Sequence, residues 1–450
     1  MSQLARKLRT IDYFTLGFGT MVGVGWLVLM DDWLQRGGPW GGILGFLLGG
    51  VLLLPIGYVY GKLVMAIPDA GGEIAYAAKV FPPSVGFFSG WMMMLAYLVV
   101  CPWEGVAIGS LTAYIFPELN RGELYRIAGQ PVFLPHLAIG LGLTALITYV
   151  NFRGIRISAA FQNWTTFGLL ALFAVFASCG LAKGEMHNTL PPFSQGAAVS
   201  ILLVLQIVPY FMTGFESVAK CAEEANPAFR ARGFFRAIVA ALLVGVGFYA
   251  LILFVVSYAW PWQELEHRPF ATIYALEHAL GARWVVNIVL IAALLSLLKI
   301  FNGNFLASSR LLFALGRRQM VNGRVAYIHE KNQTPVVSIL AIGALTSVGV
   351  CMGKAILVPV TEVGSLACAC GWLSACAAYF CIEASATQRL IAFIGAMVSV
   401  ALIAMKLLWF VPGHFSLAEW IALAVWIGVG LLVRGQATVR VATRAALQEQ

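Results

Sequence analysis

The sequence predicts an all-α polytopic membrane protein with about twelve spanning helices, arranged as one integral domain over residues 1–450. Hydrophobic residues make up 60% of the chain and charged residues only 11%, and the mean hydropathy is +0.85. These values lie outside the range of soluble globular domains. Apolar segments of the roughly 20 residues that a bilayer crossing needs recur along the whole chain. The basic start and the apolar run after it indicate a retained first span, because no small-residue cleavage site follows.

Each expected span is an apolar segment bounded by charged residues, glycines or prolines. The segments are 12–34, 41–66, 84–116, 134–150, 157–180, 196–221, 234–259, 283–316, 335–353, 357–382, 389–410 and 416–434. The even number of spans puts both termini on the same side of the membrane.

Lysine and arginine residues predict which side that is. With the N-terminus inside, 20 of the 29 Lys and Arg residues fall in inner segments, seven in outer segments and two within spans. The positive-inside rule therefore predicts cytoplasmic termini and a location in the plasma or inner membrane. The net charge of +9 is spread over many short loops, which indicates contact with anionic lipid and argues against a nucleic-acid partner.

The first span contains an unusual cluster of glycines in the stretch "GFGTMVGVGWLVL" at 17–29. Glycine costs roughly 1 kcal/mol against alanine inside a helix. Close helix packing explains the glycines of "GGILGFLLGG" at 41–50. In the first span Gly23-Val24-Gly25 lies near the middle, so we expect a helix break whose free backbone groups line a binding site.

A second break is expected in the sixth span, where "VPYFMTGFESVAK" places Pro209, Gly214 and Glu216 close together. Breaks five spans apart predict an inverted five-plus-five repeat, with repeat one at about 12–180 and repeat two at about 196–382. Short amphipathic helices are expected after the second span and after the seventh, on opposite sides. The last two spans, at about 389–434, are additional to the repeat.

At this point the sequence resembles the amino acid–polyamine–organocation transporters, over nearly the whole chain. Four patches carry the resemblance: Gly23-Val24-Gly25-Trp26, "PDAGGEIAYAAKVFPPSVGFFSGW" at 68–91, "TGFES" at 213–217 with "AEEANP" after it, and "SSRLLFALGRR" at 308–318 with Thr334-Pro335 downstream. Two positions depart from the family pattern. Val24 replaces a small polar residue and Trp26 replaces a small aliphatic one, which affects the detailed substrate pocket.

The resemblance implies a secondary active permease that moves an amino acid or a related amine by alternating access. Its substrate-binding residues would come from both broken spans and are Val22, Gly23, Val24, Gly25, Trp26, Tyr210, Phe211, Thr213, Gly214 and Phe215. By this resemblance a substrate carboxylate meets free N–H groups of the first break, where the positive end of a helix dipole also favours an anion. The substrate ammonium meets carbonyls of the second break. The aromatic residues are equally well explained by ordinary apolar packing.

Three ionisable residues inside spans are the remaining candidates, since a charge in the bilayer interior is costly unless it is paired or hydrated. Glu216 is assigned to coupling or gating, with stabilisation of the broken helix as its first role. Glu104 is a substrate-binding candidate, and Lys299 a coupling candidate whose ammonium replaces a bound cation. Their estimated depths, about 18 Å and 24 Å at 1.5 Å per residue, allow a Lys299–Glu104 pair. By contrast, Glu73, Glu223 and Glu224 are expected to be solvated.

Other function classes lack their chemical signatures in this sequence. We find no nucleophile–base pair, no metal-ligand spacing among the histidines and cysteines, and no nucleotide-binding P-loop. An enzyme, a channel and a cofactor are therefore disfavoured. The excess of acidic residues near the presumed site keeps a cationic amine or polyamine exchanger as the alternative function. Uniport, exchange, coupling to a proton or to sodium, and the oligomeric state stay open at this stage.

Overall fold

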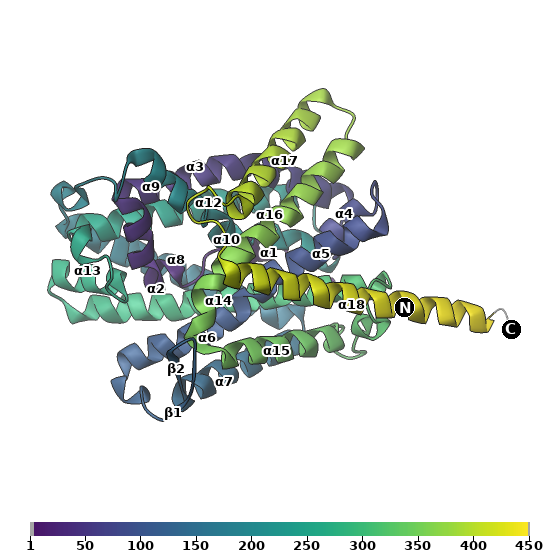
Figure 1. The fold of residues 1–450 in the computed structure, drawn as a ribbon, viewed down its shortest axis with the longest axis horizontal. Coiled ribbons are helices and arrows are strands. Elements are labelled where there is room, and N and C mark those ends of the chain that lie inside the picture. Colours follow the sequence, from purple (N-terminus) through teal and green to yellow (C-terminus); the bar gives the residue numbers. More distant parts are fainter. Residues whose placement is uncertain (1–3, 449–450) are drawn as a thin grey trace.

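The computed structural model describes residues 4–448, without the side chains of Lys354, 356–361 and 435–448. Helices form almost all of the regular structure (Figure 1). In chain order the helices are α1 Thr10–Met21, α2 Gly25–Val28, α3 Met30–Ala66, α4 Glu73–Ala77, α5 Pro83–Leu98, α6 Val100–Ile115, α7 Leu134–Arg153, α8 Ile155–Lys183, α9 Ala197–Leu205, α10 Val208–Met212, α11 Ser217–Lys220, α12 Arg232–Ala259, α13 Ala271–Leu280, α14 Arg283–Arg317, α15 Val336–Cys351, α16 Leu357–Ile382, α17 Ala386–Leu407 and α18 Leu417–Gln448.

Ten helical segments of the described residues are long and apolar enough to cross a membrane. The two other expected spans are also present, in shorter form: α15 has 16 residues, and the sixth span is divided among α9, α10 and α11. The boundary predicted between the first and second spans coincides with a kink inside α3, where Gly38 has φ 63°. The chain is thus a multi-pass membrane protein built from helices.

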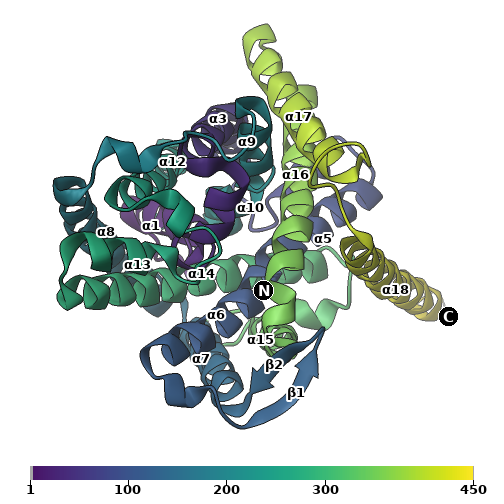
Figure 2. The same cartoon turned by 60° about the vertical axis from the view of Figure 1, so that its left-hand side comes forward.

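The broken first span lies at the centre of the bundle. Its first half, α1, packs against α8, α12 and α14. The helices α17 and α18 lie at the periphery, where α17 contacts α16 and α3 and α18 contacts α16 (Figure 2). A two-stranded antiparallel hairpin, β1 Glu123–Ile127 and β2 Gln130–Phe133, joins α6 to α7. The connections after the second and seventh spans contain the expected short helices, α4 and α13.

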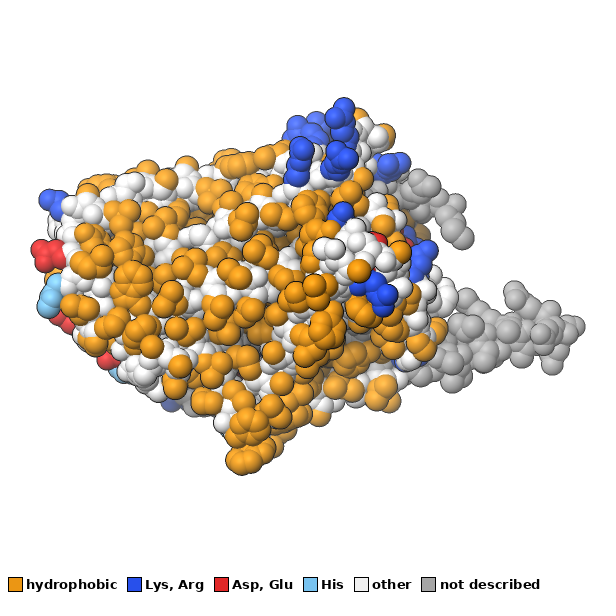
Figure 3. Space-filling view, turned by 90° about the horizontal axis from the view of Figure 1, so that it is seen from above, with side chains coloured by type: hydrophobic (Ala, Val, Ile, Leu, Met, Phe, Trp, Pro, Cys, Tyr) orange, Lys and Arg blue, Asp and Glu red, His pale blue; other side chains and the backbone are white. Residues whose placement is uncertain are grey.

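The surface agrees with a membrane setting. On the face seen in Figure 3 hydrophobic side chains cover most of the surface, Lys and Arg gather toward one end, and Asp, Glu and His lie mainly at the other. Such a lateral band is the arrangement that lipid chains require.

The glycines of the second span pack against the sixth span. A Cβ atom at Gly41, Gly45 or Gly49 would lie 2.5–2.8 Å from Ser200, Val204 and Val208 respectively. These positions are four residues apart, so they form one stripe on the helix surface. Close approach of two spanning helices therefore explains these glycines.

We predict that Gly49→Ala lowers the apparent melting temperature in detergent, because its Cβ would lie 2.5 Å from Val208 Cγ1. Overpacking of this kind typically costs about 1–3 kcal/mol. The double variant Gly49→Ala with Val208→Ala should recover most of the loss. Gly428→Ala is the matched control, since no heavy atom lies within 4 Å of its Cβ position. Equal melting temperatures for the two single variants would contradict this packing role.

Candidate substrate site

The first span is interrupted between Met21 and Gly25, as the sequence predicts. Val22 has φ −92° and ψ 104°, an extended conformation that ends α1. The interruption leaves backbone carbonyl groups without helical N–H donors in an apolar interior, where each needs a partner.

Side chains of α14 supply the donors for these carbonyls. Ser296 Oγ donates to the carbonyl of Gly23 at 2.7 Å. Lys299 Nζ donates to the carbonyl of Val22 and also contacts that of Gly19 at 3.5 Å. The side-chain amide of Asn304 binds the Thr20 carbonyl in the same way, at 2.9 Å.

Polar groups of two other helices lie near the N–H groups of the break. The carboxyl group of Glu104 on α6 lies near the Val24 N–H. The hydroxyl of Tyr249 on α12 lies near the Gly23 N–H and donates a hydrogen bond to the carbonyl of Met21 at 3.1 Å. Polar groups from three helices therefore surround the interrupted backbone.

Neighbouring side chains approach the glycines of the break closely. A Cβ at Gly23 would lie 2.5 Å from Ile300 Cδ1 and 2.8 Å from Glu104 Oε1. A Cβ at Gly25 would lie 2.6 Å from Phe211 Cε1. Real Cβ atoms do not approach other heavy atoms this closely, so any larger residue would displace these side chains.

The sixth span is interrupted next to the first. Its helix α10 ends at Met212 and α11 begins at Ser217. Gly214 lies between them with φ 138°, and a Cβ there would lie 2.5 Å from the backbone nitrogen of Met21. Glu216 accepts hydrogen bonds from the Gly214 N–H at 3.1 Å and from the Tyr97 hydroxyl at 3.0 Å. The two breaks are thus in direct contact, and Glu216 stabilises the second one.

A small cavity of about 10 Å³ lies between the two breaks, with room for roughly one water molecule. Six residues expected from the sequence line it: Gly23, Gly25, Glu104, Tyr210, Phe211 and Thr213. Five that were not singled out line it too: Thr20, Met21, Val100, Trp103 and Ile300. Of these five, Val100 could have been found from the sequence, because it lies one turn before Glu104 on the same helix face.

Two expected residues point elsewhere. Trp26 is fully buried and stacks on Phe176, with ring centroids 5.5 Å apart. Phe215 is fully buried as well and stacks on Trp372 at 5.7 Å. Of the remaining candidates, Val22 and Val24 contribute backbone groups.

Lys299 and Glu104 do not form the direct ion pair that the sequence allowed. Among the described residues neither takes part in a salt bridge within 4.0 Å. Both residues are buried, at 0% and 1% exposure. Lys299 instead contacts carbonyl groups of the broken span, and Glu104 lies near its N–H side.

Two carboxylates that the sequence indicated to be solvated are buried. Glu73 contacts the Lys220 ammonium and accepts a hydrogen bond from the Tyr60 hydroxyl at 2.5 Å. Glu224 pairs with Arg310 at 2.8 Å. The expectation of solvation was wrong because both carboxylates have cationic partners from distant parts of the chain. Glu223 is partly exposed and pairs with Arg317 at 2.5 Å.

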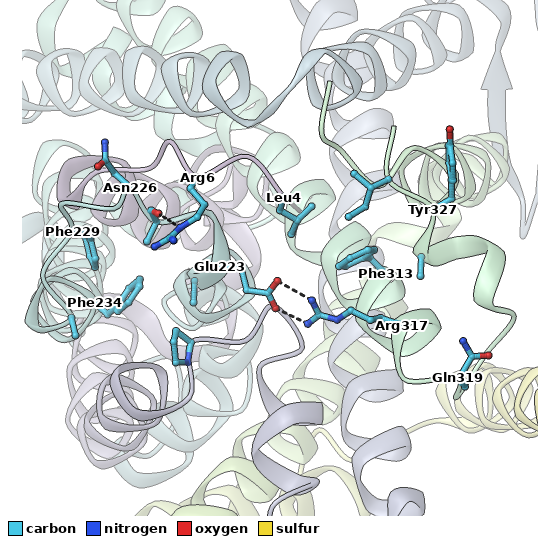
Figure 4. A pocket seen from close by; sticks show the side chains of 16 residues that line it. Leu4, Arg6, Glu223, Asn226, Phe229, Phe234, Phe313, Arg317, Gln319 and Tyr327 are labelled. Carbon is cyan, nitrogen blue, oxygen red and sulfur yellow. Dashed lines mark hydrogen bonds and ion pairs between the residues drawn. The ribbon is translucent and has the colours of Figure 1, made fainter. Parts of the chain in front are cut away.

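Two larger cavities lie on either side of the small one along the first span. One of about 280 Å³ is lined by Asp31, Asp32 and His267 and shares Phe211 with the small cavity. The other, of about 880 Å³, lies near the N-terminus and is lined by Arg6, Glu223 and Arg317 among others (Figure 4).

We predict that Gly214→Ala lowers the apparent melting temperature by several degrees, because alanine is strained at φ 138° and its Cβ would meet the Met21 backbone. Strain of this kind costs about 1–3 kcal/mol. Thermal unfolding in detergent measures the change. Gly247→Ala is the control, since nothing lies within 4 Å of its Cβ position. Identical unfolding of both variants would disprove the tight contact between the breaks.

Residues 8–433 match the family model of amino acid permeases. Three curated relatives show the same similarity. The amino-acid permease RocE of Bacillus subtilis (strain 168) is 24% identical over 327 residues, 70% of this chain and 66% of the relative. The methylthioribose transporter of the same strain is 25% identical, over 74% of this chain and 72% of the relative. The aromatic amino acid transport protein AroP of Salmonella typhimurium (strain SL1344) is 25% identical, over 81% and 77%.

Proposed function

Because this chain belongs to the amino acid permease family, we propose that it is a secondary active transporter whose substrate binds between the two broken spans. It is a transporter of amino acids or related compounds and not an enzyme. The names of its relatives range from amino acids to methylthioribose, so the family alone does not fix the substrate.

One observation carries this proposal: the small cavity lies where both broken spans expose backbone polar groups. Discontinuous helices in contact near the middle of the bundle are the usual substrate and ion sites of secondary transporters. In this proposal the backbone of Gly23, Val24 and Gly25 and the residues Tyr210 and Thr213 form the site.

The proposed orientation has both termini in the cytoplasm of the cell whose plasma or inner membrane holds the protein. It rests on the excess of Lys and Arg in the predicted inner segments and on their gathering at one end of the molecule (Figure 3). The 880 Å³ cavity near Arg6 then faces the cytoplasm, and the 280 Å³ cavity near Asp31 faces outward.

Phe211 is proposed as the outer gate. It lines both the small cavity and the 280 Å³ cavity, and it packs edge-on against Trp33 with ring centroids 4.8 Å apart. Rotation of this ring would join the two cavities, which is the kind of local closure that alternating access needs.

A thermal-shift screen of the purified protein against amino acids, amines and polyamines tests the function directly. A ligand that binds only the folded state raises its apparent stability by RT ln(1 + [L]/Kd). The ligand found in this way then serves in uptake assays with proteoliposomes.

We predict that Gly25→Leu reduces uptake at least tenfold while the protein stays monodisperse in detergent. A leucine side chain would occupy the space between the break and Phe211, where a Cβ alone would lie 2.6 Å from the ring. Gly247→Leu carries the same substitution at an exposed position with open space around it and should transport normally. Monodisperse Gly25→Leu protein with undiminished ligand binding would exclude this site.

Lys299 is proposed to act in coupling, as an ammonium held where a cation would otherwise bind. Its Nζ contacts the carbonyl groups of Gly19 and Val22 and lies 5.2 Å from the centre of the Phe18 ring. Carbonyl oxygens at a broken helix are typical ligands of a coupling cation. Release of the ammonium from these carbonyls would then bias the equilibrium between inward and outward states.

We predict that Lys299→Met lowers the uptake rate and flattens its dependence on pH while the ligand still binds. Uptake measured across a pH series with the thermal-shift assay in parallel separates the two effects. Lys406→Met is the control, because this buried lysine contacts Glu362 and not the break. Normal uptake with an unchanged pH profile would remove Lys299 from coupling. Sodium-dependent uptake by the wild type would also argue against a coupling role of Lys299.

A further inference from the structure

Under the proposed function a substrate carboxylate would meet the N–H groups of the first break, and the carboxyl group of Glu104 lies at that place. Its Oε1 lies 2.8 Å from the position of a Cβ on Gly23, and the group lies near the Val24 N–H. The side chain is 1% exposed and lines the small cavity. Glu104 is therefore part of the proposed substrate site.

Side chains already fill the space around the neighbouring residues of the break. The Tyr249 hydroxyl lies near the Gly23 N–H. The Phe211 ring lies against Gly25, with Cε1 2.6 Å from the Cβ position. A substrate carboxylate would have to displace one of these groups and would lie beside a like charge, which is unfavourable in a buried site.

Glu104 also has an unused acceptor. Its Oε2 is buried and has no hydrogen-bond partner among the described residues. The one cationic side chain nearby, Lys299, is taken by the carbonyl groups of Gly19 and Val22. A buried carboxylate oxygen without a donor is costly to leave unpaired, so it is the natural contact for an ammonium group that enters the cavity.

We propose that Glu104 is a specificity-determining residue that supplies the carboxylate of the site, and that the substrate is an amine without an α-carboxylate. This inference rests on the proposed transport function and narrows its substrate class. The ammonium of the amine binds Glu104 Oε2, while the Val24 N–H lies near the same carboxylate.

Matched pairs of an amino acid and its decarboxylation product test the inference, because each pair differs only in the carboxylate. The pairs are alanine and ethylamine, serine and ethanolamine, lysine and cadaverine, arginine and agmatine, and tyrosine and tyramine. The measurement is the apparent melting temperature of the full-length protein in detergent, followed by uptake into proteoliposomes. We expect at least one amine to raise the melting temperature and its amino acid to leave it unchanged.

Two variants of Glu104 sharpen the test. Glu104→Gln keeps the shape of the side chain and removes its charge, and should weaken amine binding at least tenfold. Glu104→Ala opens the space beside Gly23 and Val24, and should bind the amino acid of the matching pair in preference to the amine, since the substrate now brings its own carboxylate. Glu118→Gln, at an exposed position on the loop after α6, is the control and should bind like the wild type.

Each outcome bears on a different claim. Stabilisation of the wild type by amino acids but not by their amines overturns the inference and leaves the transport function intact. Unchanged amine binding by Glu104→Gln also overturns it. If no member of any pair raises the melting temperature of the wild type or is taken up by it, the proposed site fails together with the inference.

Discussion

The structure depends on the interrupted backbone of the first span, whose polar groups must find partners inside an apolar bundle. In a membrane interior an unsatisfied N–H or C=O group costs several kcal/mol. Here Ser296 and Lys299 of α14 bind the carbonyls, while Glu104 of α6 and Tyr249 of α12 lie near the N–H groups. One break thereby fixes the positions of three helices around it. It is also the reason why polar side chains converge on the small cavity.

The same break explains how two ionisable side chains are held in the bilayer interior without a salt bridge. An isolated buried charge is strongly unfavourable unless polar groups surround it. Lys299 lies on the carbonyl side of the break and Glu104 near its N–H side, so each group meets backbone dipoles of the sign that suits it. At the second break Glu216 accepts a hydrogen bond from the Gly214 N–H. Because Gly214 also touches the Met21 backbone, the two breaks are mechanically linked.

Local features of the sequence predicted the spans and both breaks, since glycines, proline and apolar run lengths act within a few residues. Partners distant in sequence could not be predicted in this way. Lys220 meets Glu73 across 147 residues, and without that contact Glu73 reads as a solvated loop residue. The rotation of a helix about its axis is equally non-local. Trp26 lies directly beside the break, yet it packs on Phe176, and only the tertiary structure shows this.

The two sides of the small cavity differ in the interactions that border them. Toward the 280 Å³ cavity lies the Phe211 ring, held by aromatic contacts, and such pairs contribute about 0.5–1.5 kcal/mol beyond their burial. On the N-terminal side the second break leads to Lys220, whose ammonium is buried against Glu73. Removing one partner of a buried ion pair typically costs about 3–5 kcal/mol. From these magnitudes we expect the proposed transporter to open more readily past Phe211 than past Lys220, unless ligand binding changes the contacts of Glu216 that lie between them.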